Sequence, residues 1–225
     1  MAISVRGLVA QRDCFRLCVD AFDADAGGIA LLGRNGAGKS TLLLALQGLL
    51  KHTGIVERSG RCAGVFAQPS VLRGSVVWNI AAVTSAALGL DQATAHVRAH
   101  QILASVELGN VMSLDARRLS SGQRQRLALA RALALEPDML FLDEPFASVD
   151  ADGRPELRAL VGDYIARSGC VLVLATQNLA DVMALCKKAL VIDDGQPVEM
   201  LDVSAIKNSQ NPHLRAIVSE SCLLV

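Results

Sequence analysis

The residues with the clearest chemistry form a glycine-rich stretch near the N-terminus. It fills the phosphate-binding pattern G-x-x-x-x-G-K-[ST] at every specified position with Gly33, Arg34, Asn35, Gly36, Ala37, Gly38, Lys39, Ser40 and Thr41. Glycines let such a loop curl tightly, so that its backbone N–H groups converge on a polyphosphate with no Cβ in the way. Lys39 adds a positive charge, and the Ser40 hydroxyl can bind Mg²⁺. The stretch therefore predicts a nucleotide site.

The segments on either side of this loop have the pattern that the motif needs. Residues 29–32 are all apolar and predict a buried strand that leads into the loop. Residues 42–46 are also apolar and predict a helix whose positive N-terminal end points at the phosphates. We expect strand, loop and helix in that order.

Two adjacent carboxylates provide a second set of chemical groups. Asp143 and Glu144 directly follow the apolar residues 139–142. A fully apolar strand is typical of the centre of a parallel sheet, and α/β sheets bind their ligands at the carboxyl ends of such strands. Two neighbouring carboxylates at that end are costly unless a cation or proton chemistry uses them.

Two weaker signals lie between these motifs. Ser120 or Ser121 can cap a helix with an apolar stripe at Leu127, Ala130 and Leu133, and a capped helix start can bind an anion. Taken alone, this stretch is more simply a basic amphipathic helix with an ordinary cap. Gln68 follows two short predicted strands and precedes a proline, so by itself it is more simply a loop residue than a functional one.

Composition limits the classes of protein to which this chain can belong. A chain of 225 residues suits one α/β domain, with or without a small insertion. The 22 basic and 22 acidic residues argue against nucleic-acid binding through bulk positive charge, although a local basic patch stays open. No apolar run reaches spanning length and no secretory signal is evident. Six scattered cysteines without a C-x-x-C pair favour reduced thiols, and hence the cytoplasm.

Periodicity predicts the remaining elements. The uncharged residues 74–90 predict helices in a small subdomain, with part of one face left for an apolar partner. His96 and His100 lie four apart on a predicted helix, but without a third ligand we interpret them as solvated residues. We also predict strands at 3–9, 17–25, 55–56 and 63–67, helices at 93–106, 154–167 and 178–186, a final strand and turn at 191–197, and a short tail at 208–225.

Taken together, these motifs resemble the nucleotide-binding subunit of an ATP-binding cassette (ABC) transporter. The phosphate loop is followed by Gln68 as the Q-loop, 119–123 as the signature, 140–144 as the second Walker motif and 147–150 as the D-loop. The resemblance implies an α/β fold with a RecA-like P-loop NTPase core and an antiparallel β portion. It also implies that residues 1–225 form a single cassette domain with a helical subdomain inserted at about 69–136.

The family's site residues can be carried over to matching positions. The resemblance implies that Lys39 and the loop amides hold the β- and γ-phosphates of ATP. It implies Mg²⁺ binding by Ser40 and Gln68, with support from Asp143, and a general base in Glu144. These parts position groups and stabilise charge, which is most of what phosphoryl transfer requires.

The same resemblance implies partners. Two cassettes, most simply two copies of this chain, would form a head-to-tail dimer in which Ser120, Gly122 and Gln123 of one face the γ-phosphate held by the other. A separate transmembrane permease and, indirectly, a substrate-binding protein are implied, with the cassette at the cytoplasmic face of the cell membrane and no nucleic acid bound. Residues 68–76 are similar to tungstate and phosphate-type anion importers, so import of an oxyanion is expected.

Other functions are kept open at this point. A soluble cassette ATPase acting on DNA or ribosomes is one alternative, although those relatives generally carry long insertions or two cassettes in one chain. An exporter subunit is another. A kinase using the same loop would leave the signature and D-loop unexplained.

Three positions depart from the family pattern. Gln177 replaces the switch histidine; its amide can reach the γ-phosphate but cannot carry a proton, which predicts slow but nonzero hydrolysis. Ser121 replaces a signature glycine, a change that we expect to be tolerated. For the aromatic residue that stacks on adenine, Phe15 is preferred to Phe22, because Phe22 falls in a strand pattern that favours core packing.

Overall fold

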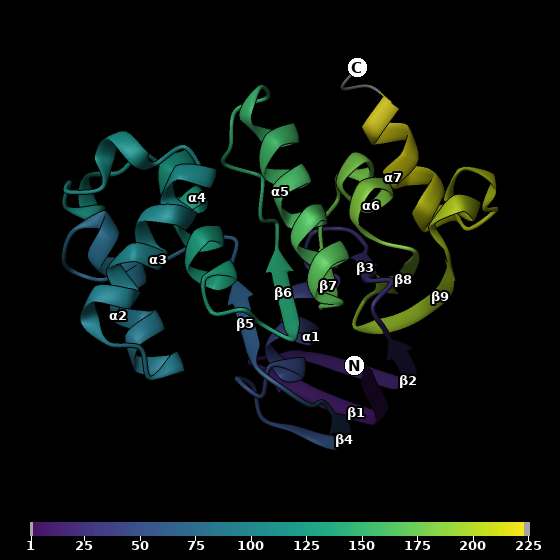
Figure 1. The fold of residues 1–225 in the computed structure, drawn as a ribbon. Coiled ribbons are helices and arrows are strands. Elements are labelled where there is room, and N and C mark those ends of the chain that lie inside the picture. Colours follow the sequence, from purple (N-terminus) through teal and green to yellow (C-terminus); the bar gives the residue numbers. More distant parts are fainter. Residues whose placement is uncertain (1, 223–225) are drawn as a thin grey trace.

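The computed structural model describes residues 2–222 as an α/β fold built on two sheets (Figure 1). The larger sheet has the strand order β5-β6-β7-β3-β8-β9, and all neighbours except β8 and β9 pair in parallel. Its strands are β3 (Ile29–Leu32), β5 (Cys62–Val65), β6 (Met139–Asp143), β7 (Val171–Ala175), β8 (Lys188–Asp193) and β9 (Gln196–Asp202). The predicted α/β class is confirmed.

The central strands are buried on both faces, which explains their unbroken apolar sequences. Every residue of β3, β6 and β7 is buried. Along β6, Met139 and Phe141 pack with α1 (Lys39–Leu46) and the N-terminal strands, whereas Leu140 and Leu142 pack with the helices on the opposite face. This two-sided burial is typical of parallel sheets and leaves the strand ends as the place for polar groups.

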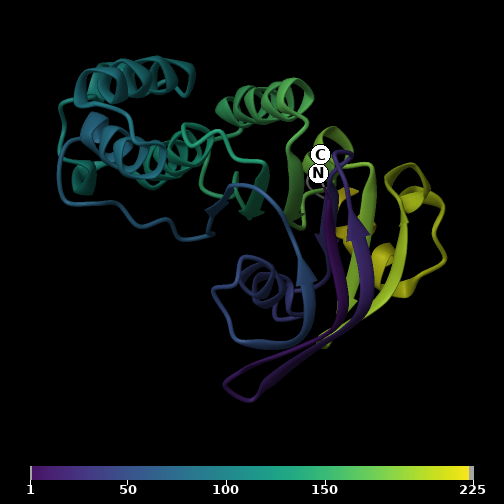
Figure 2. The same ribbon diagram turned by 60° about the horizontal axis from the view of Figure 1, so that its bottom comes forward.

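The smaller sheet is antiparallel and has the order β2-β1-β4, formed by β1 (Ile3–Arg12), β2 (Phe15–Ala24) and β4 (His52–Glu57). Figure 2 shows β1 and β2 as a long purple hairpin along one side of the molecule. The predicted opening strands are present, and both β1 and the start of β2 extend beyond the predicted limits. The N–H of Cys18 donates to the Gly195 carbonyl oxygen at 2.8 Å, which ties this hairpin to the β8–β9 turn.

The chain between β5 and β6 is helical. It contains α2 (Val76–Leu88), α3 (Gln92–Ser105), two 3₁₀ turns at Gly109–Val111 and Ala116–Arg118, and α4 (Ser121–Leu133). Figure 1 shows these helices grouped beside the large sheet. The apolar residues of α2 pack mainly inside this group, and the exposed large side chain of the helix is Trp78. The uncharged segment thus forms a helix, as predicted.

The last part of the chain contains more structure than the sequence predicted. Helix α5 (Gly153–Ser168) and helix α6 (Leu179–Leu185) are near their expected positions. The predicted final strand and turn are followed by a further strand, β9, and by a 3₁₀ segment at Val203–Asn208. The predicted short tail is wrong, because it contains α7 (Pro212–Cys222), which buries Leu214 and Ile217. The end of that tail, 223–225, lies outside the described residues.

The described residues, 2–222, contain no membrane-spanning helix and no cluster of metal-binding side chains. None of their helices is long and apolar enough to cross a membrane. Within the same residues no three His, Cys, Asp or Glu side chains lie together in a way that could hold a metal ion. His96 is half-buried, and its Nδ1 lies 2.8 Å from the Gln92 carbonyl oxygen of its own helix.

Candidate nucleotide site

The phosphate loop connects the end of β3 to the start of α1, and its glycines are required by geometry. Gly33 has φ 153°, and a Cβ at this position would overlap the backbone oxygen of Ile192. Gly38 has φ 111° and directly precedes α1; a Cβ here would lie 2.9 Å from Cζ of Phe15. Only glycine fits both positions, so the loop can lie against β8 on one side and the Phe15 ring on the other.

A cavity of about 540 Å³ lies beside this loop and brings together most of the predicted site residues. It is bounded by the β1–β2 turn, the phosphate loop, the start of α1 and the carboxyl end of β6. The residues lining it are Arg12, Asp13, Cys14, Phe15, Asn35, Gly36, Gly38, Lys39, Ser40, Thr41, Ala67, Asp143 and Glu144. The half-buried Phe15 ring at its edge is placed where it could stack on a base held above the loop.

Lys39 is buried, and its ammonium group is held by the loop itself. Its Nζ donates to the carbonyl oxygens of Gly33 at 2.7 Å and Arg34 at 3.0 Å. Burial lowers the pKa of Lys39, and the nearby carboxylates of Glu144 and Asp143 act in the opposite direction. The positive charge therefore lies within a polar loop beside two carboxylates, where an anionic phosphate would be a stronger partner than neutral carbonyls.

Asp143 and Glu144 lie at the end of β6, and the backbone turns sharply between them and the next helix. Glu144 has φ 45°, an uncommon conformation for this residue type, and its N–H donates to the Ala175 carbonyl oxygen at 2.9 Å. Burial raises the pKa of Glu144, against the hydrogen bond from Thr176 and the charge of Lys39. Asp143 is buried and shares the cavity with the Ser40 hydroxyl, and oxygen groups of this kind suit Mg²⁺.

Both oxygens of the Glu144 carboxylate accept hydrogen bonds from the loop after β7. The Thr176 hydroxyl donates to Oε2 at 3.1 Å, and the backbone N–H of Gln177 donates to Oε1 at 3.1 Å. Reasoning from sequence alone missed Thr176. It is the first polar residue after the five apolar residues of β7, and the rule that α/β sheets bind ligands at their carboxyl ends could have found it.

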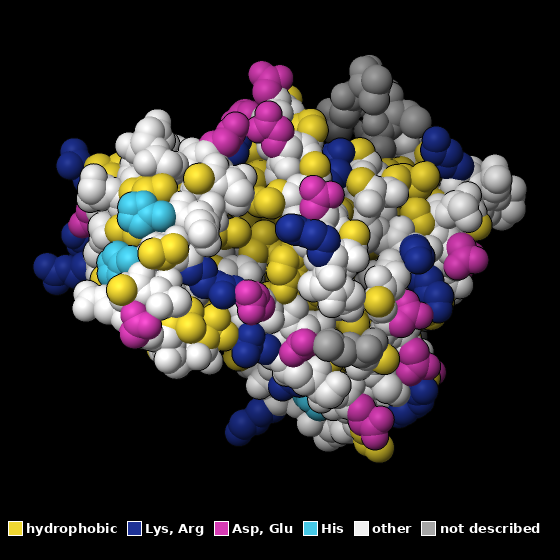
Figure 3. Space-filling view, in the orientation of Figure 1, with side chains coloured by type: hydrophobic (Ala, Val, Ile, Leu, Met, Phe, Trp, Pro, Cys, Tyr) yellow, Lys and Arg dark blue, Asp and Glu magenta, His cyan; other side chains and the backbone are white. Residues whose placement is uncertain are grey.

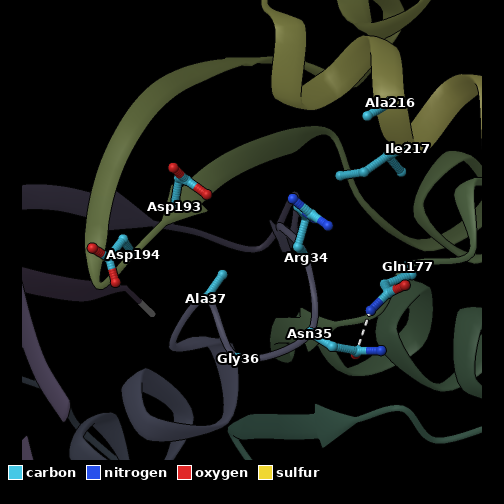
Figure 4. Close-up of a pocket in the computed structure, with 9 residues that line it drawn as sticks. All are labelled: Arg34, Asn35, Gly36, Ala37, Gln177, Asp193, Asp194, Ala216 and Ile217. Carbon is cyan, nitrogen blue, oxygen red and sulfur yellow. Dashed lines mark hydrogen bonds between the residues drawn. The ribbon is translucent and has the colours of Figure 1, made fainter.

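The Gln177 side chain faces a different cavity. Its Nε2 donates to Oδ1 of Asn35 at 2.6 Å, as the dashed line in Figure 4 shows. This second cavity, of about 430 Å³, lies on the other side of the phosphate loop, and Asn35 and Gly36 line both cavities. Its remaining lining residues include Arg34, Ala37, Gln177, Asp193, Asp194, and Ala216 and Ile217 of α7. In this structure the Gln177 side chain thus reaches the phosphate loop, but not the cavity that holds Lys39 and Glu144.

The other predicted site residues lie outside both cavities. Gln68 is exposed, three residues beyond the end of β5. Its neighbour Ala67 lines the cavity that holds Lys39 and Glu144, which we call the nucleotide cavity. At the start of α4, Oγ of Ser120 accepts from the Gln123 N–H at 3.2 Å, and Oε1 of Gln123 accepts from the Ser120 N–H at 3.0 Å. Ser120, and not Ser121, is therefore the cap. A Cβ at Gly122 would lie 3.0 Å from the Ser148 carbonyl oxygen of the D-loop.

Comparison with known proteins gives consistent results. Residues 22–147 match the family described as ABC transporter. Over 200 residues the chain is 38% identical to the aliphatic sulfonates import ATP-binding protein SsuB 1 of Streptomyces avermitilis, covering 86% of this chain and 74% of the relative. Over 227 residues it is 35% identical to the molybdenum import ATP-binding protein ModC of Mycobacterium tuberculosis, covering 91% of this chain and 60% of that protein.

A solved structure shares the fold at low sequence identity. It is a dimeric ATP-binding cassette in a post-hydrolysis state, bound to ADP and Pi. The TM-score is 0.80 at 18% identity, and the match covers 89% of this chain and 98% of the other.

The position of Phe15 leads to a prediction about adenine binding. Phe15→Ala should weaken ATP binding about fivefold or more, because stacking of a base on an aromatic ring contributes about 1–3 kcal/mol. Binding of inorganic tripolyphosphate, which has no base, should stay the same. Isothermal titration of both ligands measures the difference, with the exposed Phe66→Ala as control. Equal ATP affinity in Phe15→Ala and the parent would contradict the assignment.

Proposed function

Because the chain belongs to the ABC transporter family, we propose that it is the ATP-hydrolysing subunit of an importer and drives a separate transmembrane permease. The observation that carries this proposal is the nucleotide cavity. Lys39, Ser40, Asp143 and Glu144, from two distant parts of the chain, line one space beside the phosphate loop. They supply the charge, the metal-binding oxygens and the base that hydrolysis of a phosphoanhydride requires.

In the proposed reaction a water molecule attacks the γ-phosphorus of ATP. The new P–O bond forms as the bond to the β,γ-bridging oxygen breaks, and one proton of the water passes to the Glu144 carboxylate, leaving ADP and phosphate. Lys39 exchanges the carbonyl oxygens of Gly33 and Arg34 for phosphate oxygens. Mg²⁺, when held by Ser40 and Asp143, with Gln68 as a further ligand, would neutralise charge on the phosphates.

A head-to-tail dimer is part of the proposal. Ser120, Gly122 and Gln123 line neither cavity of their own chain within residues 2–222. If the cassette uses them at the γ-phosphate, a second copy has to supply them. The dimeric cassette with ADP and Pi, which shares this fold, supports such an arrangement.

The permease contact is proposed at the edge of the helical segment. Leu72, between Gln68 and α2, is 40% exposed, and Trp78, in the first turn of α2, is 43% exposed. Exposed large apolar side chains close in sequence are suited to burial against another protein. We propose that residues 69–136 act as the helical subdomain that carries this contact, with the cassette on the cytoplasmic face of the membrane.

The transported compound is proposed to be a small oxyanion, delivered by a substrate-binding protein. Two relatives are named as importers of aliphatic sulfonates and of molybdenum, and the sulfonate group is itself an oxyanion. The similarity of residues 68–76 to tungstate and phosphate-type importers supports the same class. Because of that similarity, we take tungstate as the specific candidate.

An ATPase acting on DNA or ribosomes is the alternative that co-purification tests. The formal net charge is zero, and the face in Figure 3 shows basic and acidic side chains interspersed. We expect the tagged chain, extracted in mild detergent, to retain a polytopic membrane protein. Leu72→Ser combined with Trp78→Ser should lose it, whereas the exposed Val97→Ser should keep it. Recovery of ribosomes or DNA in place of a membrane protein would contradict the proposal.

Substitution of the proposed base gives a second prediction. Glu144→Gln should lower ATP hydrolysis about 10²- to 10⁴-fold, since the amide cannot take a proton. Because ATP would still bind, a nucleotide-bound dimer should accumulate, which size-exclusion chromatography with ATP detects. Lys39→Ala is the matched control, because it should lose ATP binding and the dimer together. A Glu144→Gln variant that hydrolyses ATP at the parental rate would rule out this base.

The glutamine at position 177 gives a third prediction. Its amide is bonded to Asn35 and carries no titratable proton. Gln177→His should raise the ATPase rate of the assembled transporter about tenfold or more, because an imidazole can both bond the γ-phosphate and move a proton. Gln177→Asn, which keeps the amide but shortens its reach, should not raise it. An unchanged rate in Gln177→His would show that hydrolysis is not slow for this reason.

A further inference from the structure

We propose that Thr176 is a positioning residue for hydrolysis, whose hydroxyl holds the Glu144 carboxylate in the orientation that receives the proton of the attacking water. The inference rests on the proposed function, because it takes Glu144 as the base. It assigns a role to a residue outside the family motifs considered above.

The Thr176 hydroxyl is fixed in direction by its two partners. Thr176 is 1% exposed, and its Oγ1 lies 3.1 Å from Oε2 of Glu144 and accepts from the backbone N–H of Asn178, also at 3.1 Å. A backbone N–H can only donate. The hydroxyl therefore uses a lone pair toward Asn178, and its own proton points at the carboxylate.

The carboxylate is held at both oxygens by consecutive residues. Thr176 occupies one lone pair of Oε2, the Gln177 N–H occupies one of Oε1, and the Glu144 N–H donates to Ala175. Each oxygen keeps a second lone pair for a water molecule in the cavity that Glu144 lines. Without the hydroxyl, one of the two anchors of the carboxylate is lost, and the group can turn toward the Lys39 ammonium, which attracts it.

A purely structural role for this hydroxyl is the competing explanation, and the chain contains a residue that shows what such a role looks like. Thr84 in α2 is fully buried, and its hydroxyl lies 3.0 Å from the Ile80 carbonyl oxygen and 3.1 Å from that of Ala81. The Thr84 hydroxyl thus has its hydrogen-bond acceptors within its own helix, and Thr84 is distant in sequence from the residues that line the cavity. Thr176 differs because its acceptor is the carboxylate placed to do the chemistry.

Steady-state kinetics of the assembled transporter test this role. Thr176→Val keeps the shape but removes the hydroxyl, and it should lower kcat about tenfold with KM for ATP nearly unchanged, a fraction of the 10²- to 10⁴-fold that a positioned base contributes. Thr176→Ser should restore kcat to near the parental value. Thr84→Val, the matched control, should lower thermal stability and leave kcat unchanged.

Two further measurements separate the possible failures. Thr176→Ala should show the same loss as Thr176→Val, which covers the case in which the valine variant does not fold. In a Glu144→Gln background, Thr176→Val should cause no additional loss of rate. Parental kcat in Thr176→Val and Thr176→Ala, or no recovery in Thr176→Ser, would overturn the inference while leaving Glu144 as the base. Parental kcat in Glu144→Gln would overturn the proposed function itself.

Discussion

The site depends on one electrostatic constraint, the burial of an ammonium group beside two carboxylates at one edge of a parallel sheet. Lys39, Asp143 and Glu144 come from segments about a hundred residues apart and meet because β3 and β6 end on the same side, with β7 between them. Buried charges persist only when they are paired or hydrogen-bonded. Here the ammonium group of the lysine is held by two loop carbonyls, and one carboxylate accepts hydrogen bonds from two donors.

The strand between them has a role that a motif search does not show. β7 separates β6 from β3, and the loop after it contacts both neighbours. Thr176 and the Gln177 backbone bond Glu144, while the Gln177 side chain bonds Asn35 of the phosphate loop. A single short loop thus connects Glu144 to the phosphate loop through hydrogen bonds.

The parts that sequence predicted are those set by local patterns. The phosphate loop is predicted by the fixed spacing of its motif. The strand β6 is predicted by its unbroken apolar residues, which burial on both faces requires, and Asp143 comes at the end of that strand. The direction of the Gln177 side chain was not predictable, because it depends on Asn35, 142 residues away. Helix α7 was missed although its sequence carries two helix signals, Pro212 at the first position and Leu214, Ile217 and Val218 at helical spacing, with which it packs against β8 and the 3₁₀ segment before it.

The signature shows how one set of groups can serve both folding and binding. In the capping box at the start of α4, the Ser120 hydroxyl acts as an acceptor and the Gln123 amide oxygen as another. A phosphate has only acceptor oxygens and requires donors. The cap uses the acceptor capacity of these side chains and leaves the hydroxyl proton of Ser120 and the amide protons of Gln123 to donate. A helix start that is already ordered in the single chain therefore presents the donors that a γ-phosphate on a second copy would need.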